Sequence, residues 1–488
     1  MAIHEWLLDK ESKRKLALFR SIEENDGLAE ESEILMENLD LSEFLLKKTV
    51  NELNADFEKF KLKGYFQVRL EGSKVSLKEK GLATSEFLES AYIRESIAFN
   101  LLHTIFFQKF ISVNDYAMEH YVSYPIVYKE LKKLRDRLSQ LDIVITKKFQ
   151  FEGSEWAVRQ FFYVLYFKVY KDSFDFYPKN SVSYSEQLIE TMQEMYAIRL
   201  SDQSLVKFKH YLCITQYRGG RLNVESQKKD ASLLDHNIFA VDEIQQIQDT
   251  PFISSISKEA LLAQNETLFI LSFLLIEGYI SEKSNEKLQE IPKIKQLSKH
   301  FIEALVEQFS LNKKKIMETN IFEPLNKIHY KAYLLDYFKY YTSKQFNMYY
   351  FQQNYGLFFD FCKTFIFSCK ENSRYQKIWE NRVSLFYEYL FVLIDYIPLA
   401  LIAPPVHIYI DFSLGKFYNE YIKKNIFSFD TLNVVVDSYI GEKTSLILTD
   451  YLMEKFQKEI DCIVWLSPPR AVDWANFATK VIEIRQEK

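Results

Sequence analysis

Two stretches of the sequence, LSEFLLKKTVNELNADF at residues 41–57 and VSYPIVYKELKKLRDRL at residues 122–138, carry the same pattern of apolar side chains. When Ser42 is aligned with Ser123, apolar residues coincide at steps of four, three, four and three. This spacing places them on one face of an α-helix, so we predict two helices that begin after the serines and pack through equivalent faces. The coinciding pairs are Leu46 with Val127, Val50 with Leu131, Leu53 with Leu134, Phe57 with Leu138, and Phe60 with Leu141.

The composition indicates a large, mainly helical protein. A chain of 488 residues exceeds what one hydrophobic core supports and predicts three to five domains. Only 11 Gly and 10 Pro are present, so little of the chain suits tight turns and long helices are expected to dominate. The formal net charge of −5 excludes a general attraction to nucleic acid, and any contact with a polyanion must come from a local basic surface.

Cysteine usage and hydropathy exclude several further classes. The four cysteines lie in apolar stretches without C-x-x-C spacing, which predicts reduced core residues and neither a disulfide framework nor a zinc site. Charged residues appear at the N-terminus before any secretory apolar segment develops. The most apolar stretch, from Leu385, is interrupted by Glu388 and Asp395, so we expect a buried helix there, no membrane contact and a cytoplasmic protein.

The segments around both serine-led helices complete a helix-turn-helix with a wing. An apolar helix is predicted upstream of each, starting near Leu16 and near Ile97, and a short second helix follows it. Downstream, YFQVRLEGSKVSL from Tyr65 is typical of a β-hairpin, and IVITKKFQFEG from Ile143 repeats that role more loosely. The order helix, helix, turn, helix and wing thus occurs twice, whereas two ordinary helical hairpins are the alternative.

Basic residues distinguish the second copy from the first. Between Ile126 and Lys148, seven basic residues stand against three acidic ones, a net charge of +4. Lysines off the apolar face of a recognition helix would meet phosphates, and tyrosines there would touch sugars or bases. An ordinary solvated helix face is the alternative. The predicted DNA-binding residues of this copy are Ser123, Tyr124, Pro125, Tyr128, Lys129, Lys132, Lys133, Arg135, Lys147 and Lys148.

The first copy presents a weaker surface for DNA. Its second helix is acidic, with Glu30, Glu33 and Glu37 among its residues, and carboxylates repel a phosphate backbone. We therefore expect the second copy to supply most of the affinity for double-stranded DNA, and the first copy to assist it or to contact a partner. The candidate DNA-binding residues of the first copy are Ser42, Lys47, Lys48 and Asn51.

The middle of the chain suggests two related helical bundles, at 175–287 and 288–399. In each, a helix and loop precede a helix that contains the pair His-Tyr, at His210 and His329. A neutral imidazole can accept a phosphoryl group near pH 7, and the added charge would bias an interface. A histidine hydrogen-bonded inside a bundle is the alternative. No histidine and carboxylate show the i, i+4 spacing of a metal site on a predicted helix.

From residue 400 the pattern changes to short β-branched runs that alternate with helix-like segments. VHIYIDF, LNVVVDSY, TSLILTD and CIVWLS are the expected strands, and their alternation with helices predicts a small parallel α/β sheet. The loop DFSLGK after the first strand occupies the position where such folds place an anion site. It has one glycine and no G-x-x-x-x-G-K-[ST] pattern, so nucleotide binding is not predicted.

The assembled order of domains resembles the Mga/AtxA family of transcription regulators from Gram-positive bacteria, which control virulence and surface-protein genes. The best-matching pieces are VSYPIVYKELKKLRDRL leading to FEGSEWAVRQFF, and FKHYLCITQYRGG, and the resemblance covers essentially the whole chain. It implies winged helix-turn-helix units at 1–90 and 91–174, phosphotransferase-system regulation domains at 175–287 and 288–399, and an enzyme IIB-like domain at 400–488. It also implies self-association.

The resemblance assigns roles to individual residues. It implies that the phosphocarrier protein of the sugar phosphotransferase system leads to phosphorylation of His210 and His329. Arg218 follows His210 as the family motif expects, whereas no arginine follows His329 at the equivalent distance. Enzyme IIB proteins carry a reactive cysteine just after the first strand, where this chain has Ser413, and Cys462 stands at the last strand instead. We therefore expect this domain to be non-catalytic.

The sequence thus predicts a mainly α, multidomain DNA-binding regulator that forms a homodimer or higher homo-oligomer, needs no cofactor or metal, and is not an enzyme. The alternatives are a phosphotransferase-system component that passes phosphate onward, an RNA-binding antiterminator, and a protein-only scaffold. The missing cysteine disfavours the first, and the helical N-terminus disfavours the second. The third uses both winged helices for subunit contacts only, and a salt-titrated DNA-binding curve distinguishes it, because phosphate neutralisation gives a steep negative slope.

Overall fold

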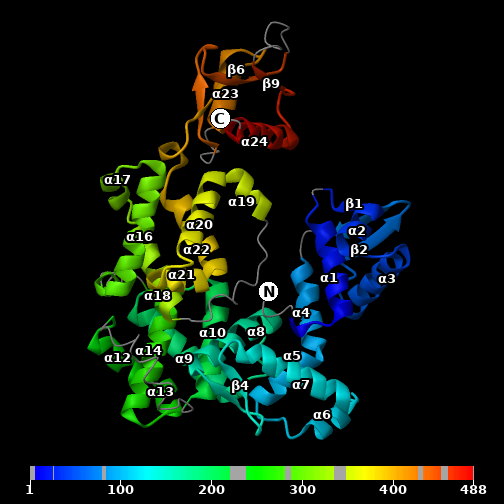
Figure 1. Cartoon of the computed structure of the whole chain (residues 1–488), viewed down its shortest axis with the longest axis vertical. Coiled ribbons are helices and arrows are strands. Elements are labelled where there is room, and N and C mark those ends of the chain that lie inside the picture. Colours follow the sequence, from blue (N-terminus) through cyan, green and yellow to red (C-terminus); the bar gives the residue numbers. More distant parts are fainter. Residues whose placement is uncertain are drawn as a thin grey trace. The chain divides into compact units, whose positions relative to one another are not determined.

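The chain folds into two compact units, one formed by Met1–Leu288 with Tyr330–Lys344 and the other by Gln289–His329 with Gln345–Lys488. Helices dominate both (Figure 1), which confirms the mainly α, multidomain fold. None of the helices among the described residues is long and apolar enough to cross a membrane. The computed structural model describes residues 6–25, 27–79, 84–219, 238–280, 287–334, 348–426, 432–451 and 460–486.

The N-terminal part of the first unit is a winged helix. It consists of α1 (Lys10–Glu23), β1 (Ala29–Glu31), α2 (Ser32–Leu39), α3 (Glu43–Lys59), β2 (Phe66–Glu71) and β3 (Lys74–Glu79). The strands form an antiparallel sheet of order β1-β3-β2, and β2 and β3 are the predicted hairpin. Phe19 and Phe66 pack with ring centroids 4.9 Å apart, and Phe57 contacts both rings. The predicted apolar face of α3 is buried: Leu46, Val50, Leu53 and Phe57.

A second winged helix follows. It consists of α4 (Ser85–Glu95), α5 (Ile97–Phe106), α6 (Val113–Glu119), α7 (Tyr124–Ser139), β4 (Ile143–Ile145), β5 (Phe151–Gly153) and α8 (Glu155–Tyr170). Strands β4 and β5 pair antiparallel and form a short wing. Residue 90, where we expected one domain to end, falls inside α4. The predicted apolar face of α7 is buried: Val127, Leu131, Leu134 and Leu138, followed by Leu141.

Gly153 closes the wing of this second copy. Its φ of +118° lies in the region that favours glycine, and a Cβ there would collide with the carbonyl oxygen of Asp142. Gly153 pairs with Ile143, the first residue of β4. The backbone at Asp142 packs directly against Gly153 of β5, and any residue with a side chain at position 153 would prevent this contact.

Helix α8 is shared between the second winged helix and a helical bundle. Phe162 packs against Phe106 of α5 with ring centroids 4.2 Å apart. From the same helix, Trp156 stacks on Phe269 of the bundle at 4.8 Å. Nearly every side chain of α8 is buried as a result. The described helices of the bundle are α9 (Lys179–Met195), α10 (Asp202–Arg218), α12 (Val241–Gln248), α13 (Pro251–Ile256) and α14 (Ala260–Ile276).

The second unit contains further helices and a C-terminal sheet. Its helical part includes α16 (Pro292–Phe309), α17 (Lys313–Met317), α18 (Phe322–Leu334, which passes into the first unit at Tyr330), α19 (Met348–Asn354), α20 (Gly356–Ser368), α21 (Gln376–Glu380) and α22 (Arg382–Tyr396). Helix α22 covers the apolar stretch from Leu385, and Leu385, Leu390 and Leu393 are buried. The buried helix predicted for this stretch is therefore confirmed.

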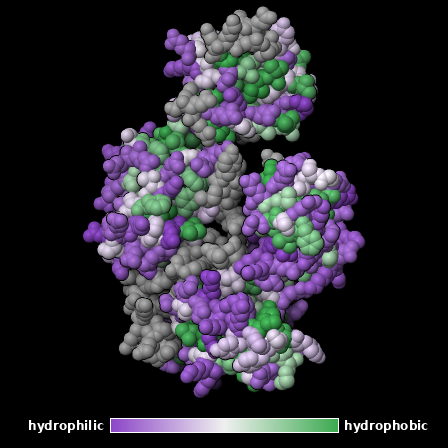
Figure 2. Space-filling view, turned by 45° about the vertical axis from the view of Figure 1, so that its right-hand side comes forward, coloured by the Kyte–Doolittle hydropathy of each residue, from purple (hydrophilic) through white to green (hydrophobic). Residues whose placement is uncertain are grey.

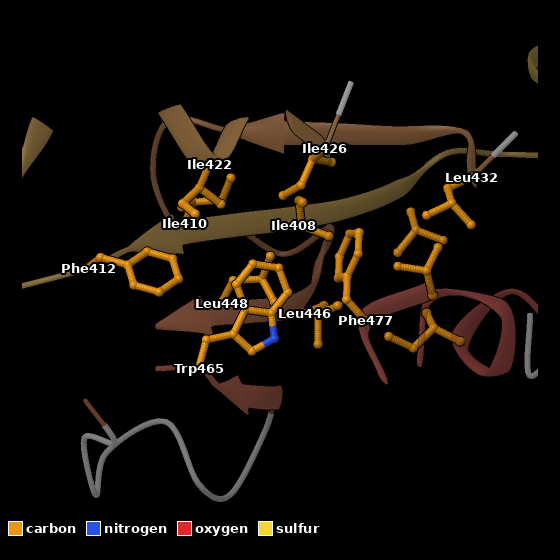
Figure 3. Close-up of a cluster of buried hydrophobic side chains, with 13 residues drawn as sticks. Ile408, Ile410, Phe412, Ile422, Ile426, Leu432, Leu446, Leu448, Trp465 and Phe477 are labelled. Carbon is orange, nitrogen blue, oxygen red and sulfur yellow. The ribbon is translucent and has the colours of Figure 1, made fainter. Parts of the chain in front are cut away.

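The C-terminal domain is the predicted parallel α/β sheet. It comprises β6 (Val406–Asp411), α23 (Lys416–Ile426), β7 (Val434–Asp437), β8 (Thr444–Thr449), β9 (Asp461–Val464) and α24 (Ala471–Gln486). The strand order is β7-β6-β8-β9, and all three pairings are parallel. Ile408 and Leu446 of the sheet, Ile422 of α23 and Phe477 of α24 belong to one buried cluster (Figure 3). Alternate residues of the strands form this core: Val406, Ile408 and Ile410 in β6, and Leu446 and Leu448 in β8.

Candidate nucleic-acid interface

Helix α7 lies at the surface of the first unit with its apolar face inward. It contacts α5, α6 and β4, and Figure 1 shows α6 beside it. Ser123 occupies the N-cap position with an extended backbone, although its hydroxyl makes no capping hydrogen bond. Pro125 follows in the first turn, where a proline sets the helical φ and a missing N–H costs nothing. The residues of this first turn, Tyr124, Pro125 and Ile126, are exposed.

The outer face of α7 and the wing carry the predicted cations. Lys133 pairs with Glu130 of the same helix at 2.7 Å. Within the described part of the chain, the ammonium groups of Lys129, Lys132, Lys147 and Lys148 form neither a hydrogen bond nor an ion pair. A lysine without a partner in the protein can neutralise a phosphate and release its counterion without first breaking an ion pair within the protein. The exposed predicted residues of this copy are Ser123, Tyr124, Pro125, Tyr128, Lys129, Lys132, Lys133, Lys147 and Lys148.

Arg135 is placed differently from these lysines. It is half-buried, and its guanidinium donates to the carbonyl oxygens of Ile145 and Thr146 in the wing at 3.3 and 3.4 Å. The guanidinium also lies over the ring of Phe149, 5.8 Å from the centroid. Arg135 therefore fixes the wing to the recognition helix in this structure.

The repeat gives Arg135 a counterpart, because Asn54 stands at the same position of the first copy. The amide of Asn54 donates to the carbonyl oxygen of Val68 at 2.8 Å and accepts from its N–H at 3.1 Å. Both copies thus use this helix position to hold a wing strand. The alignment that predicted the helices contained this signal, since Asn54 and Arg135 are eighty-one residues apart like the two serines.

Residues 83–166 match the family model of the Mga helix-turn-helix domain. These residues form a Mga helix-turn-helix domain. The match begins just before α4 and ends within α8, so it contains α7 and the whole wing. It confirms the predicted resemblance to Mga-type regulators for residues 83–166, and a helix-turn-helix of this family indicates a DNA-binding regulator. No curated protein matches the chain.

The first winged helix lies outside the Mga domain, and its two predicted DNA-binding lysines are already paired. Ser42 caps α3 by accepting from the N–H of Leu45 at 3.3 Å, as its spacing predicted. Lys47 pairs with Glu43 at 2.5 Å, and Lys48 lies 3.5 Å from Glu52. Glu52 in turn pairs with Arg14 at 2.7 Å. The predicted residues of this copy, Ser42, Lys47, Lys48 and Asn51, are all exposed.

An open groove of about 430 Å³ runs between α3 and β2 of the first winged helix. Lys47 and Asn51 line it from the helix, and Arg69 and Glu71 line it from the strand. Both cations of this groove are paired, Lys47 with Glu43 and Arg69 with Glu71, which contrasts with the unpaired lysines of the Mga domain. This difference supports the expectation that the Mga domain supplies most of the DNA affinity.

A buried network of charges joins the Mga domain to the adjoining bundle. Glu155, at the start of α8, accepts from Arg218 of α10 at 2.7 and 2.6 Å and from Arg159 at 2.9 Å. Arg159 also donates to Glu266 of α14 at 2.8 Å, and Arg218 donates to the carbonyl oxygen of Phe151 in the wing at 3.3 Å. Although burial disfavours its charged form, Arg218 and Arg159 hold the pKa of Glu155 below its usual value. Sequence reasoning missed this network.

His210 lies on α10, two turns before Arg218, and is completely buried. Its Nε2 donates to the carbonyl oxygen of Lys171 at 2.6 Å, so Nδ1 accepts from the hydroxyl of Tyr177 at 3.1 Å. The ring of Phe174 packs over the imidazole, 4.5 Å between centroids. Burial lowers the pKa of His210 to about 4, which keeps the ring neutral. The segment 171–177, which connects α8 to α9, therefore covers this histidine.

His329 is buried in an equivalent way in the second unit. Ser298 donates to Asn326 at 2.7 Å and accepts from Nδ1 of His329 at 2.8 Å, while Nε2 accepts from the hydroxyl of Tyr389 at 2.8 Å. Burial lowers the pKa of His329 to about 3. Both predicted histidines are thus neutral, with both ring nitrogens engaged, as the alternative of a core histidine expects.

In the C-terminal domain, the carboxylate of Asp450 occupies the predicted anion position at the loop after β6. Asp450 accepts from the backbone N–H of Ser413 at 2.8 Å and from its hydroxyl at 2.6 Å. Although partial burial opposes ionisation, these bonds hold the pKa of Asp450 below its usual value. Cys462 lies in β9, and burial raises the pKa of its thiol. Exposed apolar side chains such as Leu414 and Phe417 adjoin the loop, and this domain shows hydrophobic surface in Figure 2.

Proposed function

We propose that the protein regulates transcription by laying α7 of the Mga domain in the major groove of double-stranded DNA, with the wing against the adjacent backbone. The observation that supports this most is the outer face of α7, where Lys129 and Lys132 are exposed and without a partner among the described residues. Lys147 and Lys148 extend the same positive surface to the wing. In the first winged helix, Lys47 and Lys48 contribute less because each is paired.

Binding of the full-length protein to a promoter fragment is expected to weaken steeply with salt. Four unpaired lysines that neutralise four phosphates give a slope of log affinity against log salt of about −3.6, since each phosphate contributes about −0.9. Fluorescence anisotropy between 50 and 300 mM KCl measures this slope. A slope near zero contradicts phosphate neutralisation and favours a protein-only scaffold instead.

The resemblance to Mga/AtxA regulators supports a finer proposal. The targets are virulence, surface-protein and sugar-metabolism genes, the active form is a homodimer or higher homo-oligomer, and the phosphocarrier protein of the sugar phosphotransferase system leads to phosphorylation of His210 and His329. Because both imidazoles are buried, phosphoryl transfer requires an open state. For His210, the cover at 171–177 must move away so that Tyr177 releases the lone pair of Nδ1.

Phe174→Ala is expected to increase phosphorylation of His210 several-fold, because it removes the ring that packs over the imidazole. The measurement is the incorporation of labelled phosphate from phosphorylated phosphocarrier protein, with His210→Ala defining the background. Phe417→Ala is the matched control, since Phe417 is exposed in the C-terminal domain. Equal labelling of Phe174→Ala and His210→Ala contradicts phosphorylation at this residue.

A further inference from the structure

The first turns of α7 present apolar side chains where the proposed interface approaches DNA bases. Tyr124, Ile126 and Tyr128 keep 47, 49 and 52% of their surface exposed, although each is large and apolar. The rings of Tyr124 and Tyr128 lie nearly parallel, 6.1 Å between centroids. Exposed apolar side chains clustered on one short segment of a surface helix mark a contact surface rather than chance exposure.

The helix periodicity divides these side chains between two flanks. Tyr128 lies two turns before Arg135, which contacts the wing, so Tyr124 and Tyr128 are on the wing side. Ile126 lies two turns before Lys133, on the opposite flank. Lys129 and Lys132, which are proposed to meet phosphates, lie on the outer face between these two flanks. In a helix-turn-helix the N-terminal residues of the recognition helix approach the base edges.

The same turns lack arginine, asparagine and glutamine, three of the side chains that most often read bases by hydrogen bonds. From Ser123 to Lys132 the chain has no arginine, asparagine or glutamine. Guanine and adenine are usually read by such groups, whereas thymine offers an apolar C5-methyl group in the major groove. An isoleucine side chain complements a methyl group and gains nothing from the polar edges of the other bases.

We infer that Ile126, with Tyr128 on the other flank, reads thymine methyl groups in the major groove and makes the Mga domain selective for thymine at defined positions. This inference rests on the proposed DNA binding and adds its base specificity. The lysines supply affinity independently of sequence, and the apolar turn supplies the choice of site. Burial of one methyl group is worth about a fourfold change in affinity, since a buried CH₂ contributes about 0.8 kcal/mol.

The test replaces thymine by deoxyuridine, which removes only the methyl group. A duplex selected from a random pool by the full-length protein is the probe, and each thymine is replaced in turn. Wild-type protein is expected to lose about fourfold or more in affinity at one or two positions. Ile126→Ala is expected to bind the thymine duplex more weakly and to lose discrimination at one of these positions, with an unchanged salt slope. Ile111→Ala, another exposed isoleucine of this domain, keeps full discrimination.

The two proposals fail in different ways. If the wild-type protein binds with a steep salt slope but is indifferent to every replacement, or if Ile126→Ala discriminates as well as the wild type, the thymine inference is overturned and DNA binding stands. If no duplex is bound in a salt-dependent way, the proposed function itself fails. Both substituted side chains are exposed, so thermal melting of the variants is expected to match the wild type.

Discussion

Simultaneous substitution of Lys129, Lys132 and Lys133 by glutamate is expected to abolish promoter binding by the full-length protein. The change removes two unpaired cations and one paired cation from α7 and places three carboxylates toward the phosphates. Losing the neutralisation of several phosphates and adding repulsion lowers affinity by about 100-fold or more at physiological salt. An electrophoretic mobility shift at several salt concentrations measures the loss.

A matched control separates this effect from the change in net charge. Lys313, Lys314 and Lys315 form an exposed run on α17 in the second unit, and their substitution by glutamate changes the net charge by the same amount. This control is expected to bind nearly as well as the wild type, because α17 lies outside the Mga domain that we propose to contact DNA. Equal loss in both triple variants contradicts a local role for α7.

Glu155→Ala is expected to destabilise the first unit by about 3–5 kcal/mol, because two buried guanidinium groups then lose their shared partner. Arg218 and Arg159 together direct three hydrogen bonds at this carboxylate. Since Arg218 also holds the carbonyl oxygen of Phe151, the wing is expected to loosen with the bundle. Hydrogen–deuterium exchange resolved by peptide measures α10, α14 and β5 separately from the second unit.

Glu152→Ala provides the comparison for this prediction. Glu152 stands three residues earlier in the wing and is exposed, so its removal is expected to change stability by no more than about 0.5 kcal/mol. Faster exchange confined to β5 in the Glu155 variant, with α10 and α14 unchanged, contradicts a network that joins wing and bundle. Similar exchange in the two variants contradicts its energetic importance altogether.

Local patterns in the sequence were sufficient to predict much of the fold. The helices after Ser42 and Ser123 follow from apolar spacing, which depends only on neighbouring residues, and both apolar faces are buried. The hairpin from Phe66 and the parallel strands from Val406 follow from equally local signals. The exposure of the lysines on α7 was predictable for the same reason, because the side opposite a buried face is open unless another element covers it.

Contacts between distant segments were beyond this reasoning. Arg218 meets Glu155 across 63 residues, and Arg159 meets Glu266 across 107. Nothing in the local spacing of these residues distinguishes them from solvated surface charges. The burial of His210 depends in the same way on the segment from Lys171, which no periodicity pairs with α10. The alignment of Asn54 with Arg135 was a long-range signal, and it was visible only through the repeat.

Helix α8 restricts how any signal can reach the DNA. Its N-terminal half inserts Trp156 into the bundle, while Phe162 anchors it to α5, so one rod is embedded in both partners. A flexible linker would let the Mga domain reorient independently of the bundle. The continuous helix α8 instead holds the two domains in a fixed relative orientation. A rotation of the bundle therefore rotates the Mga domain with it. Regulation through the bundle would change the orientation of α7 relative to DNA, and not detach the Mga domain from the bundle.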